Sequence, residues 1–175
     1  MSETIAICSE RQRGSPATAL VLHLLDRFIV MILTSDAFTD GGEIPDQYTM
    51  YGENRIPPIH INEVPTEARS LVLIVDDPDA PRGTFTHWVL FNMDTSTQDI
   101  DDSHVPKNAI TGTNDFGSTE YGGPKPPSGE HRYFFKAFAL DSSLSLPPGV
   151  KRTEVEAAMK DHVVAHATLM GKYAH

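Results

Sequence analysis

The sequence predicts a mainly β domain with one helix near the C-terminus. The 13 prolines and 12 glycines among 175 residues indicate many turns and short elements rather than a helical bundle. The apolar run at residues 71–75 (LVLIV) is typical of a strand that is covered on both faces. With 39% hydrophobic residues, a chain of this length can bury one core, so we expect a single domain.

The charge balance and the cysteine content exclude several classes of site and partner. The formal net charge is −10, from 24 acidic and 14 basic residues. A broad nucleic-acid surface needs clustered Lys and Arg side chains, so no nucleic-acid partner is expected, although a local pocket could still bind a small anion. The single cysteine, Cys8, cannot form an intrachain disulfide, a zinc ribbon or a CxxC site. A chain without disulfides fits a reducing compartment, and we expect a cytoplasmic protein.

We interpret residues 1–30 as an extra N-terminal leader and residues 31–175 as the domain. In this interpretation translation begins at Met31, and the leader is upstream read-through. The leader carries an apolar stretch that charged residues interrupt, so no transmembrane segment is expected. It also lacks the basic start and the small-residue cleavage site of a signal peptide. An added helix or a contact with a membrane surface is the alternative interpretation.

The first part of the domain alternates between strand-like and turn-like segments. The run that begins at Met31 (MILTS) predicts the first strand, and Thr39-Asp-Gly-Gly predicts a turn because glycine tolerates positive φ. Residues 44–51, with Pro45, have the pattern of an edge element. Residues 55–61 form a further short segment that contains two consecutive prolines.

Two strand-like runs, LVLIV and THWVLF, flank an acidic proline turn within residues 71–93. The turn cannot continue either strand, because its two prolines lack amide donors. Asp77, Asp79 and His87 are therefore expected near strand ends, where a rigid scaffold commonly presents loop chemistry.

A long loop precedes the next strand. Residues 95–103 contain three aspartates but lack the glycine and the distant glutamate of a calcium loop, so we interpret them as a solvated loop. Residues 111–131 are rich in glycine and proline, and a loop of about twenty residues inside a compact domain is often a binding element. His131 stands where this loop ends and the strong strand candidate 131–140 begins.

The C-terminal segment predicts a helix from about residue 153 to about residue 170. Thr153-Glu-Val-Glu156 has the form of a capping box, and Gly171 is a natural C-terminal stop. The residues that follow helical spacing are Val155, Met159, His162, Val163, His166 and Met170. His162 and His166 have the spacing of paired metal ligands, but an H-E-x-x-H motif is absent, so we interpret them as packing residues.

Asp77, Asp79, His87 and His131 form the constellation that needs an explanation. The two carboxylates and the two imidazoles could together bind a divalent metal, or an imidazole–carboxylate pair could act as general acid and base. Alternatively, the carboxylates could orient the imidazoles, which would then donate hydrogen bonds to an anionic oxygen. No G-x-S-x-G elbow accompanies them. A purely structural alternative is that the aspartates cap the turn and His87 is a satisfied core residue.

Three segments resemble the phosphatidylethanolamine-binding protein family, also called the Raf kinase inhibitor protein family. They are DPDAP at 77–81, THW at 86–88 and YGGPKPPSGEHRYFFKAFALD at 121–141. The run at 31–49 resembles the opening of the short bacterial and archaeal branch, and the resemblance covers 31–175.

The resemblance implies an antiparallel β-sandwich in Greek-key order with a helix near the C-terminus. It also implies an anion pocket that needs no metal or cofactor and in which acidic residues orient two imidazoles. Arg132 would pair with a carboxylate and hold the loop. The pocket residues implied by the resemblance are Asp77, Asp79, Pro81, His87, Pro126, Pro127, His131 and Tyr133.

The function implied by the resemblance is binding rather than catalysis. The expected ligand is a phosphorylated small molecule or a phospholipid head group, with kinase regulation as a family analogy and a homodimer as the expected assembly. An inhibitor that acts on a protease or kinase through its surface is one alternative, and an acid–base or metal-dependent hydrolase is another.

Two departures from the family pattern concern the pocket. Lys125 stands where prokaryotic relatives usually carry a cysteine, so a cation is expected at the border of the pocket. The C-terminal segment is shorter than in eukaryotic members, so the helix that partly closes their pocket is expected to be placed differently.

Overall fold

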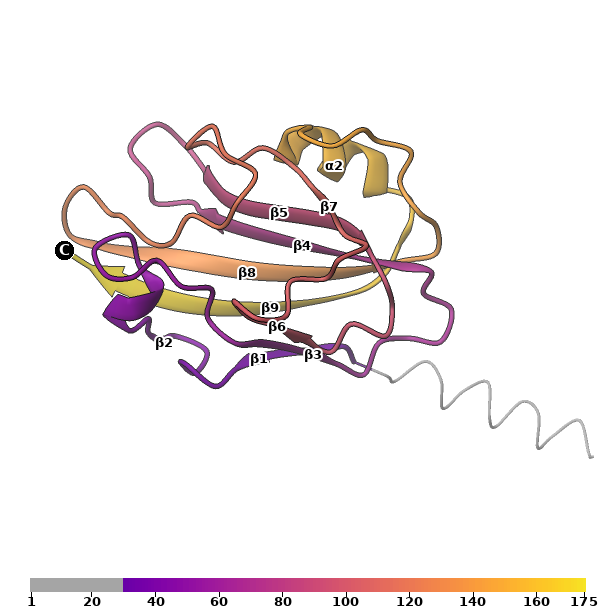
Figure 1. The fold of residues 1–175 in the computed structure, drawn as a ribbon, viewed down its shortest axis with the longest axis horizontal. Coiled ribbons are helices and arrows are strands. Elements are labelled where there is room, and N and C mark those ends of the chain that lie inside the picture. Colours follow the sequence, from indigo (N-terminus) through magenta and orange to yellow (C-terminus); the bar gives the residue numbers. More distant parts are fainter. Residues whose placement is uncertain (1–29) are drawn as a thin grey trace, which may run out of the picture.

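The computed structural model describes residues 30–175, which form two β-sheets packed face to face (Figure 1). The expectations for the leader lie outside these residues. The smaller sheet has the order β1-β3-β6 and the larger one β2-β9-β8-β4-β5-β7. In Figure 1 the smaller sheet lies below the larger one, and helix α2 covers part of the opposite face. We call the face toward the smaller sheet the inner face and the other the outer face.

The elements are short except along the middle of the larger sheet. The smaller sheet contains β1 (Ile32–Ser35), β3 (Ile59–Asn62) and β6 (Asp99–Ile100). The larger sheet contains β2 (Gly42–Glu43), β4 (Ser70–Asp77), β5 (Phe85–Met93), β7 (Ile110–Thr111), β8 (Glu130–Leu140) and β9 (Val163–Ala174). The helices are the 3₁₀ turn η2 (Asp46–Tyr48) and α2 (Arg152–Met159).

Strand β4 is buried at every position, as its continuous apolar run predicts. Leu73 belongs to the core between the two sheets, whereas Ile74 belongs to a second core under α2. Val155 and Met159 are the buried residues of that helix. The larger sheet therefore has a core on each face, and its strand ends are held from both sides.

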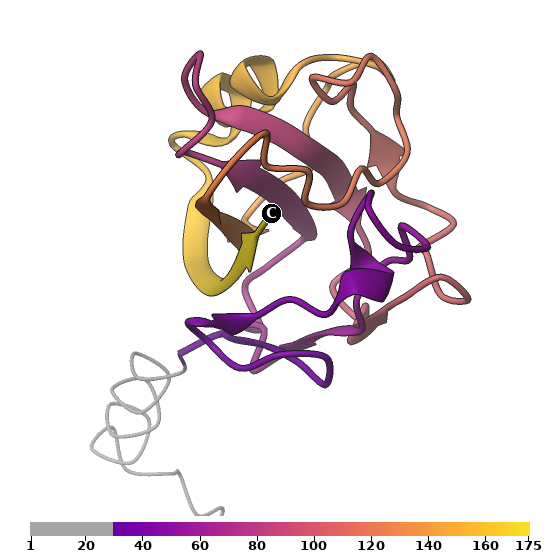
Figure 2. The same ribbon diagram turned by 90° about the vertical axis from the view of Figure 1, so that its left-hand side faces the viewer.

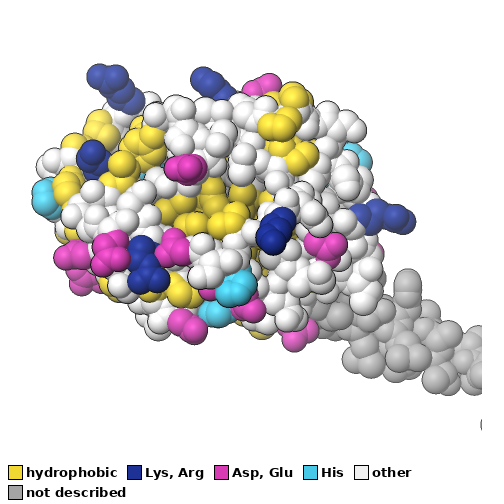
Figure 3. All heavy atoms as spheres, viewed as in Figure 1, with side chains coloured by type: hydrophobic (Ala, Val, Ile, Leu, Met, Phe, Trp, Pro, Cys, Tyr) yellow, Lys and Arg dark blue, Asp and Glu magenta, His cyan; other side chains and the backbone are white. Residues whose placement is uncertain are grey.

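The predicted architecture, a mainly antiparallel β-sandwich with a helix near the C-terminus, is confirmed. Among the strands of residues 30–175, the one parallel pair joins β2 to β9. No helix among residues 30–175 is long and apolar enough to cross a membrane. On the face seen in Figure 3, Lys and Arg side chains stand apart from one another.

The prediction of one long helix at 153–170 is wrong. Helix α2 ends at Met159, and β9 follows and pairs with β8 from Val163 to Ala174. Ala165, Ala167 and Leu169 pack against the inner core, and each intervening residue faces outward. This period of two, together with a ladder along nearly all of β8, outweighs the helical spacing of the same residues.

The residues that were predicted to begin and end the long helix have other roles in the structure. The carboxylate of Glu154, not Glu156, accepts from the Lys151 amide at 2.9 Å and caps the helix. At Gly171 a Cβ would stand 2.5 Å from Ile44, so glycine is needed there for close packing rather than for a helix stop.

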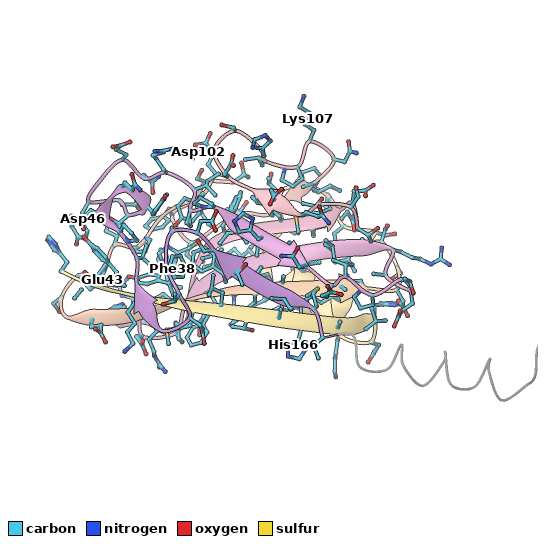
Figure 4. The ribbon with its side chains drawn as sticks, turned by 90° about the horizontal axis from the view of Figure 1, so that it is seen from below. Phe38, Glu43, Asp46, Asp102, Lys107 and His166 are labelled. Atoms are coloured by element: carbon cyan, nitrogen blue, oxygen red, sulfur yellow. The ribbon has the colours of Figure 1, made fainter. Side chains whose placement is uncertain are left out.

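His162 and His166 do not share a helix face. His162 follows the helix, and its Nδ1 lies 2.8 Å from Oδ1 of Asp141. His166 is exposed on β9 at the margin of the molecule (Figure 4). The interpretation as a packing residue is therefore wrong for His162, whereas the His166 ring stacks on Phe138 with ring centroids 6.3 Å apart. Among the described residues, no group of three His, Cys, Asp or Glu side chains is arranged to hold a metal.

The edge element predicted at 44–51 is also different in the structure. Residues 44–51 contain no strand: β2 ends before them, at Glu43, and Pro45 precedes the turn η2. Proline cannot donate to a ladder but fits the start of a helical turn, which explains the change from strand to helix.

Candidate functional site

His87 lies in a β-bulge between β4 and β5. Val75 pairs with Trp88, but the next residue, Asp76, pairs with Thr86, so His87 has no partner across the ladder. Two consecutive side chains, those of His87 and Trp88, consequently face inward. Trp88 joins the inner core, and His87 reaches a cavity at the end of the sheet.

The cavity has a volume of about 250 Å³ and opens where the β4–β5 turn meets the loop that precedes β8. Figure 2 looks onto this end of the molecule, where the loop that precedes β8 lies close to the C-terminus. Three buried polar side chains lie at its base, and the more exposed residues form its walls and rim. The lining residues are Asp77, Ala80, Pro81, Arg82, Gly83, Phe85, His87, Phe116, Lys125, Pro127 and His131.

Asp77 and His131 form a buried pair at the base of the cavity. The Nδ1 of His131 lies 2.7 Å from Oδ2 of Asp77, and both side chains are less than a tenth exposed. A carboxylate accepts, so Nδ1–H of the imidazole is the donor. The other carboxylate oxygen, Oδ1, accepts from the Asp79 amide at 2.8 Å. Asp77 therefore caps the turn and orients an imidazole at the same time.

His87 is oriented by backbone rather than by an acid. Its Nδ1 donates to the Gly122 carbonyl at 2.6 Å, and its own carbonyl accepts from the Gly122 amide at 3.2 Å. Burial lowers the pKa of His87 below its ordinary value. The free protein therefore holds a neutral imidazole here, with the lone pair on Nε2.

Asp79 pairs with Arg132 instead of an imidazole. The guanidinium donates to both carboxylate oxygens, at 2.7 and 2.9 Å, and the Arg132 amide adds a third bond at 3.0 Å. These hydrogen bonds lower the pKa of Asp79 to about 2. The expected pairing of Arg132 with a carboxylate is confirmed, whereas only one of the two imidazoles, that of His131, is held by an acid.

Pro126 and Tyr133 lie behind the cavity wall. The Pro126 carbonyl accepts from the Tyr51 hydroxyl at 2.8 Å, which fixes the loop between the rim residues Lys125 and Pro127. Tyr133 packs edge-on against His87 with ring centroids 5.2 Å apart. Its hydroxyl is buried without a partner among the described residues, and burial raises its pKa.

Comparison with known proteins identifies the family of the chain. The family model described as phosphatidylethanolamine-binding protein matches residues 34–174. The chain belongs to this family. A UPF0098 protein of Methanothermobacter thermautotrophicus is 46% identical over 148 residues, which cover 82% of this chain and 98% of the relative. A UPF0098 protein of Aquifex aeolicus is 46% identical over 151 residues, covering 82% and 88%.

Solved structures support the same assignment. A putative phosphatidylethanolamine-binding protein homologue from Chlamydia trachomatis has a TM-score of 0.80 at 39% identity, covering 84% of this chain and 99% of that one. YbcL of E. coli, described as a new member of the mammalian family, has a TM-score of 0.77 at 25% identity, covering 83% and 98%. The similarity to archaeal and bacterial members agrees with the branch that the sequence resembles.

In this family member, sequence reasoning found the polar base of the cavity but missed the aromatic wall. Pro81, Pro127 and the three polar residues line the cavity as predicted, whereas Asp79, Pro126 and Tyr133 support it from behind. The ligand-binding role of all eight stays a prediction. Phe85 and Phe116 were not expected, although an aromatic residue such as Phe116 within a polar glycine-rich loop was an available signal.

Proposed function

We propose that this family member is a binding protein that captures small phosphate monoesters in the cavity at the end of the sheet. The observation that carries the proposal is the pair of buried imidazoles, His87 and His131, at the cavity base. Each Nδ1 has a fixed acceptor, and neither Nε2 has a partner among the described residues or is closed off from solvent. Two preoriented nitrogens facing one cavity suit the tetrahedral oxygens of a phosphate.

The charge around the cavity supports an anionic ligand. Arg82 and Lys125 line it and are exposed, so the rim is cationic on a chain whose formal net charge is −10. The carboxylate of Asp77 already interacts with His131. A local positive rim attracts an anion even where the bulk charge of the protein opposes it.

An NMR titration of the full chain with inorganic phosphate tests the proposal. We expect saturable shifts of the His87 and His131 ring signals, with phosphoethanolamine and Zn²⁺ run separately. Shifts with Zn²⁺ alone would favour the metal-binding interpretation instead. If none of the three ligands changed the chemical shifts, the four residues would have a structural role, and the proposal would fail.

Phosphate binding is expected to strengthen as the pH falls from about 8 to about 6, across the ordinary histidine pKa. His87 is neutral in the free protein, because burial lowers its pKa, and its Nε2 then only accepts. A phosphate oxygen needs a donor there, so the complex takes up a proton. Calorimetry in two buffers of different ionisation enthalpy measures this uptake. The variant His87→Gln measures the share of the proton uptake that comes from the phosphate itself. Equal proton uptake by the variant and the wild type would contradict the prediction.

The alternatives are separated by different assays. A hydrolase would turn over p-nitrophenyl phosphate, and turnover lost in His87→Gln would replace the binding proposal with an acid–base mechanism. Regulation of a kinase, inhibition of a protease or kinase through the protein surface, and a homodimer are expectations that rest on the family resemblance alone.

A further inference from the structure

The walls of the cavity differ chemically from its base. The base is formed by Asp77, His87 and His131, which are all buried. The lining residues that stand between this base and solvent include two phenylalanines, two prolines and an alanine: Phe85, Phe116, Pro81, Pro127 and Ala80. A ligand whose phosphate reaches the imidazoles therefore places the rest of its structure against an apolar and partly aromatic surface.

The aromatic part of this wall is ordered by its own packing. Phe85 and Phe116 meet edge to face with centroids 4.7 Å apart, and Phe116 lies 5.4 Å from the His87 ring. Phe116 is nevertheless 40% exposed. An exposed ring that packs against two others presents a preformed surface to a planar ligand.

The loop that carries Phe116 is fixed by hydrogen bonds and close contacts. The Asn114 side chain accepts from the Phe116 amide at 3.1 Å and from the Ser118 amide at 2.9 Å. A Cβ at Gly122 would stand 2.5 Å from the Phe116 ring, so the absence of a side chain lets the ring lie on the loop backbone. The wall is thus built before any ligand arrives, which lowers the entropic cost of binding.

An ammonium group would be poorly accommodated next to the bound phosphate. Asp77 is the only carboxylate among the lining residues, and both of its oxygens already accept, from His131 and from the Asp79 amide. The charged groups at the rim, Arg82 and Lys125, are cations. They would repel an ethanolamine head group, whereas they can lie over the face of an aromatic ring.

We propose that the cavity selects aryl phosphate monoesters, with the phosphate on His87 and His131 and the ring between Phe116 and Pro127. This inference rests on the proposed function and names the class of phosphate monoester that the site prefers. Phosphate alone uses only the base of the cavity, so the aryl group adds contacts that inorganic phosphate cannot make.

Calorimetric titrations of the full chain with phenyl phosphate, inorganic phosphate and phosphoethanolamine test the proposal. We expect phenyl phosphate to bind about tenfold more tightly than inorganic phosphate, from buried apolar area and aromatic contacts, and phosphoethanolamine to bind no more tightly than inorganic phosphate. A short phosphotyrosine peptide distinguishes a free molecule from a modified side chain as the source of the aryl phosphate. Tight binding of either supports the aryl class.

The variant Phe116→Ala separates this inference from the proposed function. We expect it to lose most of the roughly tenfold preference for phenyl phosphate while its affinity for inorganic phosphate stays within about twofold. Phe134→Ala, on the outer face of β8, is the matched control and should keep the preference. If wild type binds inorganic phosphate but binds phenyl phosphate no more tightly, the aryl inference is wrong. If it does not bind phosphate at all, the proposed function fails first.

Discussion

Replacing His131 by glutamine is expected to weaken phosphate binding by at least tenfold. A hydrogen bond to a charged group contributes about 1.5–3 kcal/mol, which corresponds to about a ten- to hundredfold change in affinity. The substitution also removes the imidazole that lies 2.7 Å from Asp77 and leaves a buried carboxylate facing the anion. Calorimetric titration with inorganic phosphate at fixed pH measures the loss.

His166→Gln is the matched control for this experiment. His166 is exposed on β9 and lies across from Phe138, whereas His131 lies across from Tyr173 near the other end of the same ladder. The control should bind phosphate like wild type. An unchanged affinity in a folded His131→Gln variant would remove His131 from the site, and the thermal unfolding midpoint shows whether the variant is folded.

Replacing Lys136 by methionine is expected to lower the free energy of unfolding by about 3 kcal/mol, because it leaves the buried carboxylate of Asp76 without its nearest counter-charge. Lys136 Nζ lies 2.7 Å from Oδ2 of Asp76, whose side chain is fully buried and whose Oδ1 has no partner among the described residues. A second cation, Arg152, lies with its Nη1 3.8 Å from the same Oδ2 of Asp76. Because this cation remains in the variant, we expect a loss at the lower end of the range for such pairs. Urea denaturation measures the change.

Two further variants give this prediction its controls. Arg55→Met breaks the exposed pair with Asp102, which solvent screens, and should leave the free energy of unfolding close to that of wild type. Adding Asp76→Asn to Lys136→Met removes the uncompensated charge, so the double variant should be more stable than the single one. A double variant less stable than Lys136→Met would show that the carboxylate is not the source of the cost.

The same cluster stands directly behind the candidate site. Asp76 and Thr86 precede Asp77 and His87 in the chain, and Arg152 of α2 donates to the Thr86 hydroxyl at 3.2 Å. The outer face of the strand ends is therefore held by charges, and the inner face presents the imidazoles. Ordinary alternation along β4 is enough to place Asp76 and Asp77 on opposite faces.

Local sequence determined much of the sheet and the chemical character of the site. A continuous apolar run made β4 recognisable, and the glycine- and proline-rich composition of 111–131 marked the loop that borders the cavity. Asp77, His87 and His131 could be grouped because each stands near a strand end. These inferences need only the residues themselves and their immediate neighbours, since propensity and turn chemistry act over a few positions.

Register and long-range pairing decided the remainder. Simple alternation along β5 would place His87 on the same face as Val89 and Phe91, which belong to the outer core, and away from Asp77. The bulge reverses this and brings His87 into the cavity. Residues 163–174 likewise carry both a helical and a strand period, and pairing with β8, which lies more than twenty residues earlier in the chain, selects the strand. Sequence by itself determined which side chains were available, and tertiary structure decided which of them face one another, because a one-residue shift in a ladder moves a side chain to the opposite face of the sheet.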